Sequence, residues 1–235
     1  MELAKVLLDS EPMRETFRTG ETFPDPNLIW NIDHLDYFID IEIKSWKEHS
    51  KQLNKLLEDI SEVEASELLF DEFNVRYYLK SLFSVATFYI ACSSALDKLT
   101  TQLQKVNAYN KFGVRKPKLD IDDNFHAKAK FIRDKSFAHQ DSEKLDNIMD
   151  KRTAMFWSPT ISHKADAPAT PEDYIFGGGK WHIEVDGVRT ETEIDITVKG
   201  FNSFADKAKK QILIRKQRIA EFYNSIKSSK SNKQS

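Results

Sequence analysis

One short segment, FIRDKSFAHQD at residues 131–141, places an arginine, an aspartate and a histidine close together. These residues are Arg133, Asp134 and His139. Histidine changes its charge near neutral pH and arginine is a permanent planar cation, so side chains of these types can exchange protons and bind anions. The surrounding residues have the pattern of a core helix, and the first question is what such a helix would do with this polar group.

Helical geometry limits what these side chains can reach together. One stripe of the predicted helix has steps of four, three, four and three residues and consists of Phe125, Ala129, Ile132, Ser136 and His139. Arg133 lies at its border, and six residues, or about 240° of a regular helix, separate it from His139. The two side chains therefore cannot meet on one small ligand from one straight helix. A kink or a second copy of the helix is required, and we expect a two-fold homodimer built on this stripe.

The segment RDKSFAHQD resembles the signature of the HEPN superfamily, the helical domains of many bacterial toxin and antiphage ribonucleases. That signature is an arginine, a polar residue, and a histidine four to six positions after the arginine. Arg133, Asp134 and His139 occupy these places. The longer form, R-D-K-x-x-A-H-x-D, is similar to the abortive-infection branch of the superfamily. The resemblance covers this segment and its helical context.

The resemblance implies a dimeric, metal-independent endoribonuclease of a toxin or defence type, with a composite site at the dimer cleft. His139 would be the general acid or base at the RNA 2′-hydroxyl or the leaving oxygen. Arg133 would clamp the phosphate and stabilise the transition state, and Asp134 would orient one of the two. RNA and an antitoxin protein are the partners that follow from this resemblance.

The same segment also has a plainer interpretation. It can simply end a helix, with Arg133 paired to a carboxylate and a protonated His139 beside the last carbonyl groups. Many HEPN-like proteins are thought to be non-catalytic. The alternative function is therefore a non-catalytic helical module that binds a protein partner through the same stripe.

We predict a mainly α fold for a single domain over residues 1–235, a bundle of about five or six helices with one inserted β-hairpin. An amphipathic helix over about 32–60 follows the break FPDPN. A second helix, over about 66–109, has apolar residues around so much of its circumference that we expect it at the centre of the bundle. A third begins near Asp120 and carries the motif, and a fourth covers about 141–156.

The remaining third of the chain changes in pattern. Residues 157–179 lack a periodic apolar face, and we expect a mobile loop there. Alternation around the dipeptide Asp-Gly predicts a β-hairpin over 180–198. A basic helix follows over 203–226, and we expect a disordered tail over 228–235. From Phe201 to the last residue there are nine basic and two acidic residues.

Basic side chains on two predicted helices are the candidate contacts to an RNA backbone. They are Lys130, Lys135, Lys209, Lys210 and Arg215. The basic last helix could equally lie over the acidic first helices, in which case its charges would face carboxylates of the same chain.

Composition excludes several classes. Hydrophobic residues make up 40 %, charged residues 31 %, and the net charge is −2, so a disordered chain is not expected. Cys92 is the one cysteine, which rules out an internal disulfide and fits a cytoplasmic protein with Cys92 in its core. The uncharged run from Ser81 to Leu96 is shorter than the ~20 apolar residues of a membrane span, so we expect no membrane association.

No metal or cofactor is expected either. Asp122 and His126 are four residues apart, but Asp122 is better explained as a helix cap, and Asp33 next to His34 lacks a third ligand. The sequence GGGK at 177–180 lacks the spacing and the following helix of a phosphate-binding loop.

Overall fold

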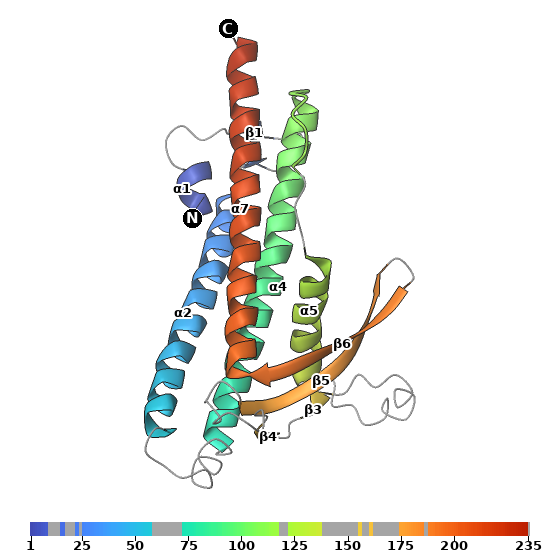
Figure 1. The fold of residues 1–235 in the computed structure, drawn as a ribbon. Helices are drawn as coiled ribbons and strands as arrows, with labels where there is room; N and C mark the ends of the chain where they lie inside the picture. The colour runs from blue at the N-terminus through green and yellow to red at the C-terminus, as the bar shows by residue number, and fades with distance from the viewer. Residues whose placement is uncertain are drawn as a thin grey trace. The chain divides into compact units, whose positions relative to one another are not determined.

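The computed structural model describes residues 1–8, 15–16, 22–23, 25–57, 72–117, 122–137, 155–156, 160–161, 174–185 and 188–234. Its described helices are α1 (Leu3–Leu7), α2 (Pro26–Leu57), α4 (Glu72–Tyr109), α5 (Asp123–Phe137) and α7 (Val198–Gln234) (Figure 1). These five helices dominate the described part of the chain, which confirms the mainly α class.

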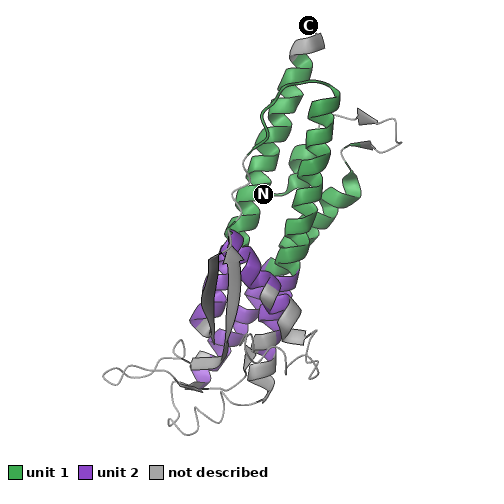
Figure 2. Ribbon diagram, turned by 90° about the vertical axis from the view of Figure 1, so that its right-hand side faces the viewer, with its two compact units in different colours: residues 1–39, 88–122, 208–235 green, residues 40–87, 123–207 purple. Residues whose placement is uncertain are grey.

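The chain divides into two compact units, and α2, α4 and α7 each contribute a segment to both (Figure 2). Unit 1 comprises Met1–Ile39, Phe88–Asp122 and Ala208–Ser235. Unit 2 comprises Asp40–Thr87 and Asp123–Lys207.

In unit 1, the segments of α2, α4 and α7 pack side by side through the apolar stripes that the sequence predicts. Ile32 on α2, Leu96 on α4 and Ile219 on α7 are fully buried. The Cys92 thiol donates a hydrogen bond to the carbonyl of Ile32 (Sγ···O 3.8 Å), so this cysteine is a core residue, as predicted. The buried side chain of Phe23 packs on Tyr223, with ring centroids 6.4 Å apart.

In unit 2, aromatic side chains form much of the core. Trp46 on α2 is 1 % exposed and lies against Phe201 on α7, with centroids 5.0 Å apart, and against Tyr77 on α4 at 6.5 Å. Phe125 on α5 packs on Phe204 of α7 at 5.0 Å. The helix that carries the motif is therefore anchored through aromatic contacts.

Helix α4 ends at Tyr109, where the sequence predicts a break. Lys111 and Gly113 adopt positive φ, a conformation that glycine accepts without strain. The Asn107 side chain holds the turn by binding both the N–H of Val114 (3.1 Å) and its carbonyl (2.7 Å).

Short and long strands complete the described backbone. Strands β1 (Glu15–Thr16) and β2 (Thr22–Phe23) pair antiparallel. Strand β5 (Tyr174–Val185) pairs antiparallel with β6 (Val188–Thr197), and with β3 (Met155–Phe156) and β4 (Thr160–Ile161).

Several predicted boundaries differ from the structure. Residues 174–179, predicted as loop, already belong to β5, because the glycines in this segment take part in the ladder that pairs it with β6. Residues 155–156, predicted as the end of a helix, form β3. The rest of that predicted helix, 141–154, and the loop residues 157–159 and 162–173 lie outside the described residues.

The last helix is longer than predicted at both ends. It begins at Val198 and continues to Gln234, through most of the segment 228–235 predicted as a disordered tail. Ile226, at the predicted end of this helix, is fully buried. The hydroxyl groups of Ser228 and Ser229 hydrogen-bond to carbonyl groups four residues earlier, within the helix.

Candidate functional site

The predicted site falls at the end of the described part of α5. Arg133 is half-buried there. Asp134 and Lys135 belong to the same helix, but only their backbone is described. His139 lies outside the described residues, so the arrangement of Arg133, Asp134 and His139 stays a prediction.

The structure corrects the predicted dimer stripe at three of its five residues, while the Ser136 side chain and His139 lie outside what is described. Phe125, Ala129 and Ile132 are 4 %, 0 % and 0 % exposed in a single chain, and Phe125 packs on Phe204 of the same chain. Because the chain's own helices already cover these side chains, they do not form a free surface for a second copy. The homodimer itself stays a prediction, and its contact must use other residues.

The burial of Ala129 predicts that Ala129→Glu destabilises the fold of the chain itself. A carboxylate at this fully buried position would lose its hydration, at a cost of about 3 kcal/mol or more. We expect a correspondingly lower free energy of unfolding in urea titration followed by circular dichroism. Lys130→Glu is the matched control, since it introduces the same side chain at the exposed neighbouring position. Equal stability of the two variants would contradict the buried placement of Ala129.

Four of the five candidate RNA contacts have described side chains, and these four lie in different environments. Lys130 and Lys210 are exposed, as an RNA contact requires. Lys209 and Arg215 instead form ion pairs inside unit 1, and Arg215 is only 1 % exposed. Arg215 is therefore not placed to meet an RNA backbone. The alternative prediction, that the last helix faces acidic residues of the same chain, describes these two residues better.

A partly buried cluster of four charges, centred on the buried Lys216, joins α2 to α7. We define this charge cluster as Asp33, Asp36, Lys209 and Lys216. The Lys216 Nζ atom lies 2.6 Å from Asp33 Oδ1 and 2.8 Å from Asp36 Oδ2, while Lys209 pairs with Asp36. Lys216 is 1 % exposed. Two anions and two cations balance each other, which is the condition under which charges can be buried.

The charge cluster also holds the N-terminal helix. The Asp33 carboxylate accepts hydrogen bonds from the backbone N–H groups of Leu3 (3.0 Å) and Ala4 (2.8 Å). These are first-turn donors of α1 that have no partner within the helix itself. Leu3 and Leu7 are fully buried, so the cap and the apolar contacts together fix α1 in unit 1.

The cluster shifts the pKa values of its members. Burial alone would raise the pKa of Asp36, but the hydrogen bonds and charges of Lys209 and Lys216 lower it overall. Burial alone would lower the pKa of Lys216, but the hydrogen bonds and charges of Asp33 and Asp36 raise it overall. Both groups are therefore more firmly charged in the folded chain than in the unfolded one.

These shifts predict how stability depends on pH. A carboxyl whose pKa is lowered by folding stabilises the fold above its ordinary value of 3.8, and this contribution is lost as pH falls through the folded pKa. An amine whose pKa is raised stabilises the fold below 10.5, and this contribution is lost as pH rises through the folded pKa. We expect Asp36→Asn to remove part of the loss at acidic pH in urea titrations. If this variant loses as much stability at acidic pH as the unmodified chain, the lowered pKa of Asp36 does not contribute as described.

A second polar group lies next to the charge cluster. The Arg215 guanidinium hydrogen-bonds to the Ser93 hydroxyl and pairs with Asp97, both on α4. Burial raises the pKa of the nearby Tyr89 phenol to about 12, and that of the Cys92 thiol to about 12. Both groups stay protonated at neutral pH, so Cys92 lacks the thiolate that a nucleophile needs.

The positions of some charged residues within the apolar stripes indicate that they are buried. Asp36 falls between Ile32 and Ile39 in the apolar stripe of α2, four residues after one and three before the other. Arg215 falls in the same way between Ile212 and Ile219 on α7. Charged residues at stripe positions indicate buried partners of opposite sign, although the stripe alone does not say which residues they are.

Among the described residues, no three His, Cys, Asp or Glu side chains come together as a set of metal ligands. One segment within the described residues, Lys80–Tyr109, could cross a membrane judged by length and composition alone. Of its most apolar window, 56 % is buried within the chain. Core helices of soluble proteins have the same character, so the expectation of no membrane association and the cytoplasmic location both stay predictions.

Comparisons of the chain with models of protein families, with curated proteins and with solved structures find no match.

Proposed function

We propose that this chain is a HEPN-like, metal-independent endoribonuclease or RNA-binding protein of a toxin or defence type. The observation that carries the proposal is the segment R-D-K-x-x-A-H-x-D, whose first residues lie on α5 of a mainly helical protein. Helix α5 is held by the buried side chains of Phe125, Ala129 and Ile132. A packed helix of this kind is a rigid support for catalytic side chains.

In this proposal, His139 transfers a proton at the RNA 2′-hydroxyl or at the leaving oxygen. Arg133 binds the phosphate, and Asp134 orients one of the two. Lys130 and Lys210 contact the RNA backbone through their exposed amines. Lys135 keeps this role as a prediction, while Lys209 and Arg215 serve the ion pairs of unit 1 instead.

The assembly belongs to the same proposal. A two-fold homodimer would bring Arg133 of one copy towards His139 of the other, through residues other than the buried stripe. An antitoxin protein would be the second partner, in the cytoplasm. We also propose a β-hairpin over 180–198 as an insertion in the helical domain, which the resemblance itself does not require.

The experiment is cleavage of a labelled RNA by the purified chain in EDTA, with a 2′-O-methyl RNA of the same sequence as control. We expect cleavage of the unmodified RNA alone, because the reaction uses the 2′-hydroxyl and needs no metal. Complete loss of cleavage on adding EDTA, or equal cleavage of the 2′-O-methyl RNA, would contradict the mechanism.

A non-catalytic module that binds a protein partner is the second candidate. Large aromatic side chains on one side of α2 favour it, since Trp30 is 51 % and Tyr37 is 60 % exposed. Exposed aromatic groups of this size are typical of binding surfaces. A module of this kind would not cleave RNA, so the His139→Ala variant and the unmodified chain would both show no cleavage. This result would separate the two candidates.

A further inference from the structure

Four large apolar side chains of unit 1 are exposed to solvent, three on α2 and one on α7. On α2, Trp30 is 51 %, Tyr37 is 60 % and Phe38 is 43 % exposed, and Leu213 on α7 is 41 % exposed. We define these four side chains as the apolar face. Contiguous apolar surface of this kind marks a place where another molecule binds.

The α2 part of the apolar face follows from helical spacing. Trp30 and Tyr37 are seven residues apart, which places them on nearly the same side of the helix and about 10 Å apart along its axis. The exposed His34 lies between them in sequence, and its ring centroid is 6.2 Å from that of Trp30. The centre of this surface is therefore a histidine with an aromatic ring on either side.

The charge cluster extends the apolar face from α2 onto α7. Leu213 comes four residues after Lys209 and three before Lys216, so all three lie on one side of α7. Lys209 binds Asp36 and Lys216 binds both Asp33 and Asp36, which shows that this side of α7 is turned towards α2. Leu213 therefore lies along the edge of α2 that carries the two aspartates.

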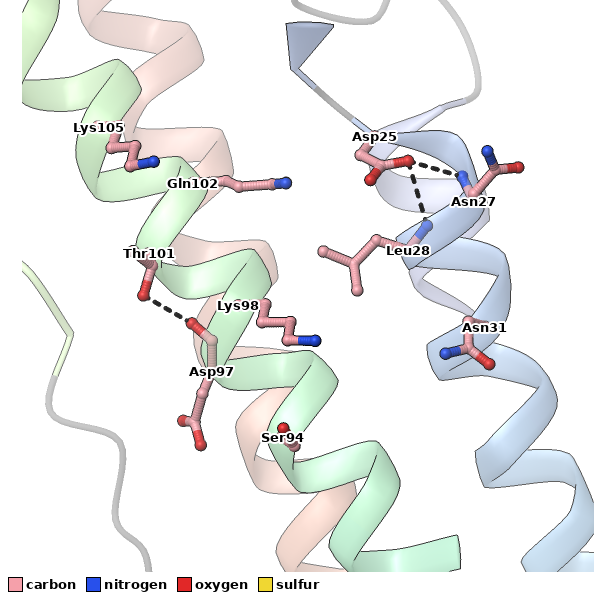
Figure 3. A pocket seen from close by; sticks show the side chains of 10 residues that line it. All are labelled: Asp25, Asn27, Leu28, Asn31, Ser94, Asp97, Lys98, Thr101, Gln102 and Lys105. Carbon is pink, nitrogen blue, oxygen red and sulfur yellow. Dashed lines mark hydrogen bonds between the residues drawn. The ribbon is translucent and has the colours of Figure 1, made fainter. Parts of the chain in front are cut away.

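Polar groups bound the apolar face on its other side, towards α4. Phe38 packs on Phe88 of α4, with ring centroids 5.5 Å apart. Next to Trp30 in sequence, Asn31 lines a polar groove together with Lys98 of α4 (Figure 3). The lining of this groove contains two aspartates and two lysines, so its formal charges balance. The apolar face is thus a patch with a polar rim, the anatomy of a protein–protein contact.

The charge of the apolar face favours a second copy of the chain as the partner. The charged side chains in residues 30–39 are Asp33 and Asp36, and both are paired with lysines of α7. A two-fold contact brings each group close to the same group of the other copy, so a surface without surplus charge can pair with itself. A lipid surface or a nucleic acid would instead be attracted by a surplus of basic side chains.

We propose that the apolar face is the contact of an antiparallel, two-fold homodimer. Pairing about the midpoint between Trp30 and Tyr37 places Trp30 of each copy against Tyr37 of the other, with the two His34 side chains next to each other at the centre. The inference rests on the proposed function for the homodimer and names its contact, in place of the buried stripe on α5.

The size of the apolar face sets the strength of this contact. Aromatic side chains bury about 150–250 Å² each, so Trp30 and Tyr37 at half exposure offer about 100 Å² each. With Phe38, Leu213 and His34, a pair of copies would bury about 1,000 Å², just below the ~1,200–2,000 Å² of stable interfaces. We therefore expect a reversible dimer with a Kd of about 1–10 µM.

The test is sedimentation velocity of the full chain at about 0.1–100 µM, which separates the 27.3 kDa monomer from a dimer of twice that mass. His34→Glu and His34→Lys each place two like charges at the centre of the contact, and we expect each to raise the Kd of the dimer at least about tenfold. An equimolar mixture of the two variants should restore the dimer, because opposite charges then meet. Gln52→Glu and Gln52→Lys are the matched controls, since they put the same charges at an exposed position elsewhere on α2.

Tyr37→Ser is a second variant, which should raise the Kd by removing apolar surface without adding charge. Because His34 and Tyr37 are exposed, we expect these variants to keep the urea unfolding curve of the unmodified chain. An unmodified chain that stays monomeric over the whole range would leave the apolar face to a different protein and overturn the proposal. Variants as dimeric as the unmodified chain, or a mixture that stays monomeric, would also overturn it.

RNA cleavage by the same variants separates this inference from the proposed function. If the variants leave the dimer unchanged while His139-dependent cleavage persists, only the apolar face as the dimer contact falls. If they become monomeric and still cleave RNA at the full rate, the dimer contact stands and the composite site of the proposed function falls.

Discussion

Replacing His139 with alanine is expected to lower the rate of RNA cleavage by about 10²–10⁴-fold, the usual contribution of a positioned general acid or base. The free energy of unfolding should change little, because the proposed function gives His139 a role in proton transfer and not in core packing. The measurement is the initial rate of cleavage of a labelled RNA in EDTA, with urea unfolding of the same preparation.

Arg133→Lys provides the companion test. Lysine keeps the positive charge but lacks the planar fork that binds a phosphate in two places, so we expect a large loss of rate with little change in stability. If both variants keep the rate of the unmodified chain, the motif has no catalytic role. If both variants unfold, the motif serves only to end a helix.

Replacing Lys216 with methionine is expected to destabilise the chain by about 3–5 kcal/mol, the usual cost of removing one partner from a buried ion pair. The change leaves the Asp33 carboxylate without its cation and Asp36 with Lys209 alone. Asp33 also caps α1, so docking of the N-terminal helix should weaken as well. Urea unfolding gives the loss of stability, and hydrogen exchange at Leu3 and Ala4 reports the docking of α1.

Lys210→Met is the matched control for this prediction. Lys210 is exposed on the same helix, so its loss should change the free energy of unfolding by no more than about 0.5 kcal/mol. Asp33→Asn combined with Lys216→Met should recover part of the stability, since it removes the carboxylate left without a cation. Equal stability of Lys216→Met and Lys210→Met would show that the charge cluster is not buried as described.

Much of the helical framework is predictable because apolar residues recur with the period of a helix. Ile32 and Ile39 on α2, and Leu96 and Leu99 on α4, are buried as their spacing predicts. The proline in the segment before α2 and the glycine after α4 mark the ends of helices for local reasons of backbone geometry. Local rules of this kind need no knowledge of the rest of the fold.

Contacts between distant segments are less predictable. The stripe Phe125, Ala129 and Ile132 is equally suited to a second copy of the chain and to the chain's own Phe204, and only tertiary structure decides between them. The same holds for Lys209, whose charge could face RNA or Asp36. The spacing of apolar and charged residues shows that one face of a helix is buried or charged. Which residues contact that face depends on the packing of segments more than 70 residues apart in the sequence.

The most direct test of the central claim is the cleavage of one labelled RNA by the purified chain in EDTA, run beside its His139→Ala variant at the same concentration. The account predicts that the unmodified chain cleaves the RNA and that the variant, equally stable to urea, is slower by at least about 10²-fold. Equal rates for the two proteins, or no cleavage by the unmodified chain, would contradict it.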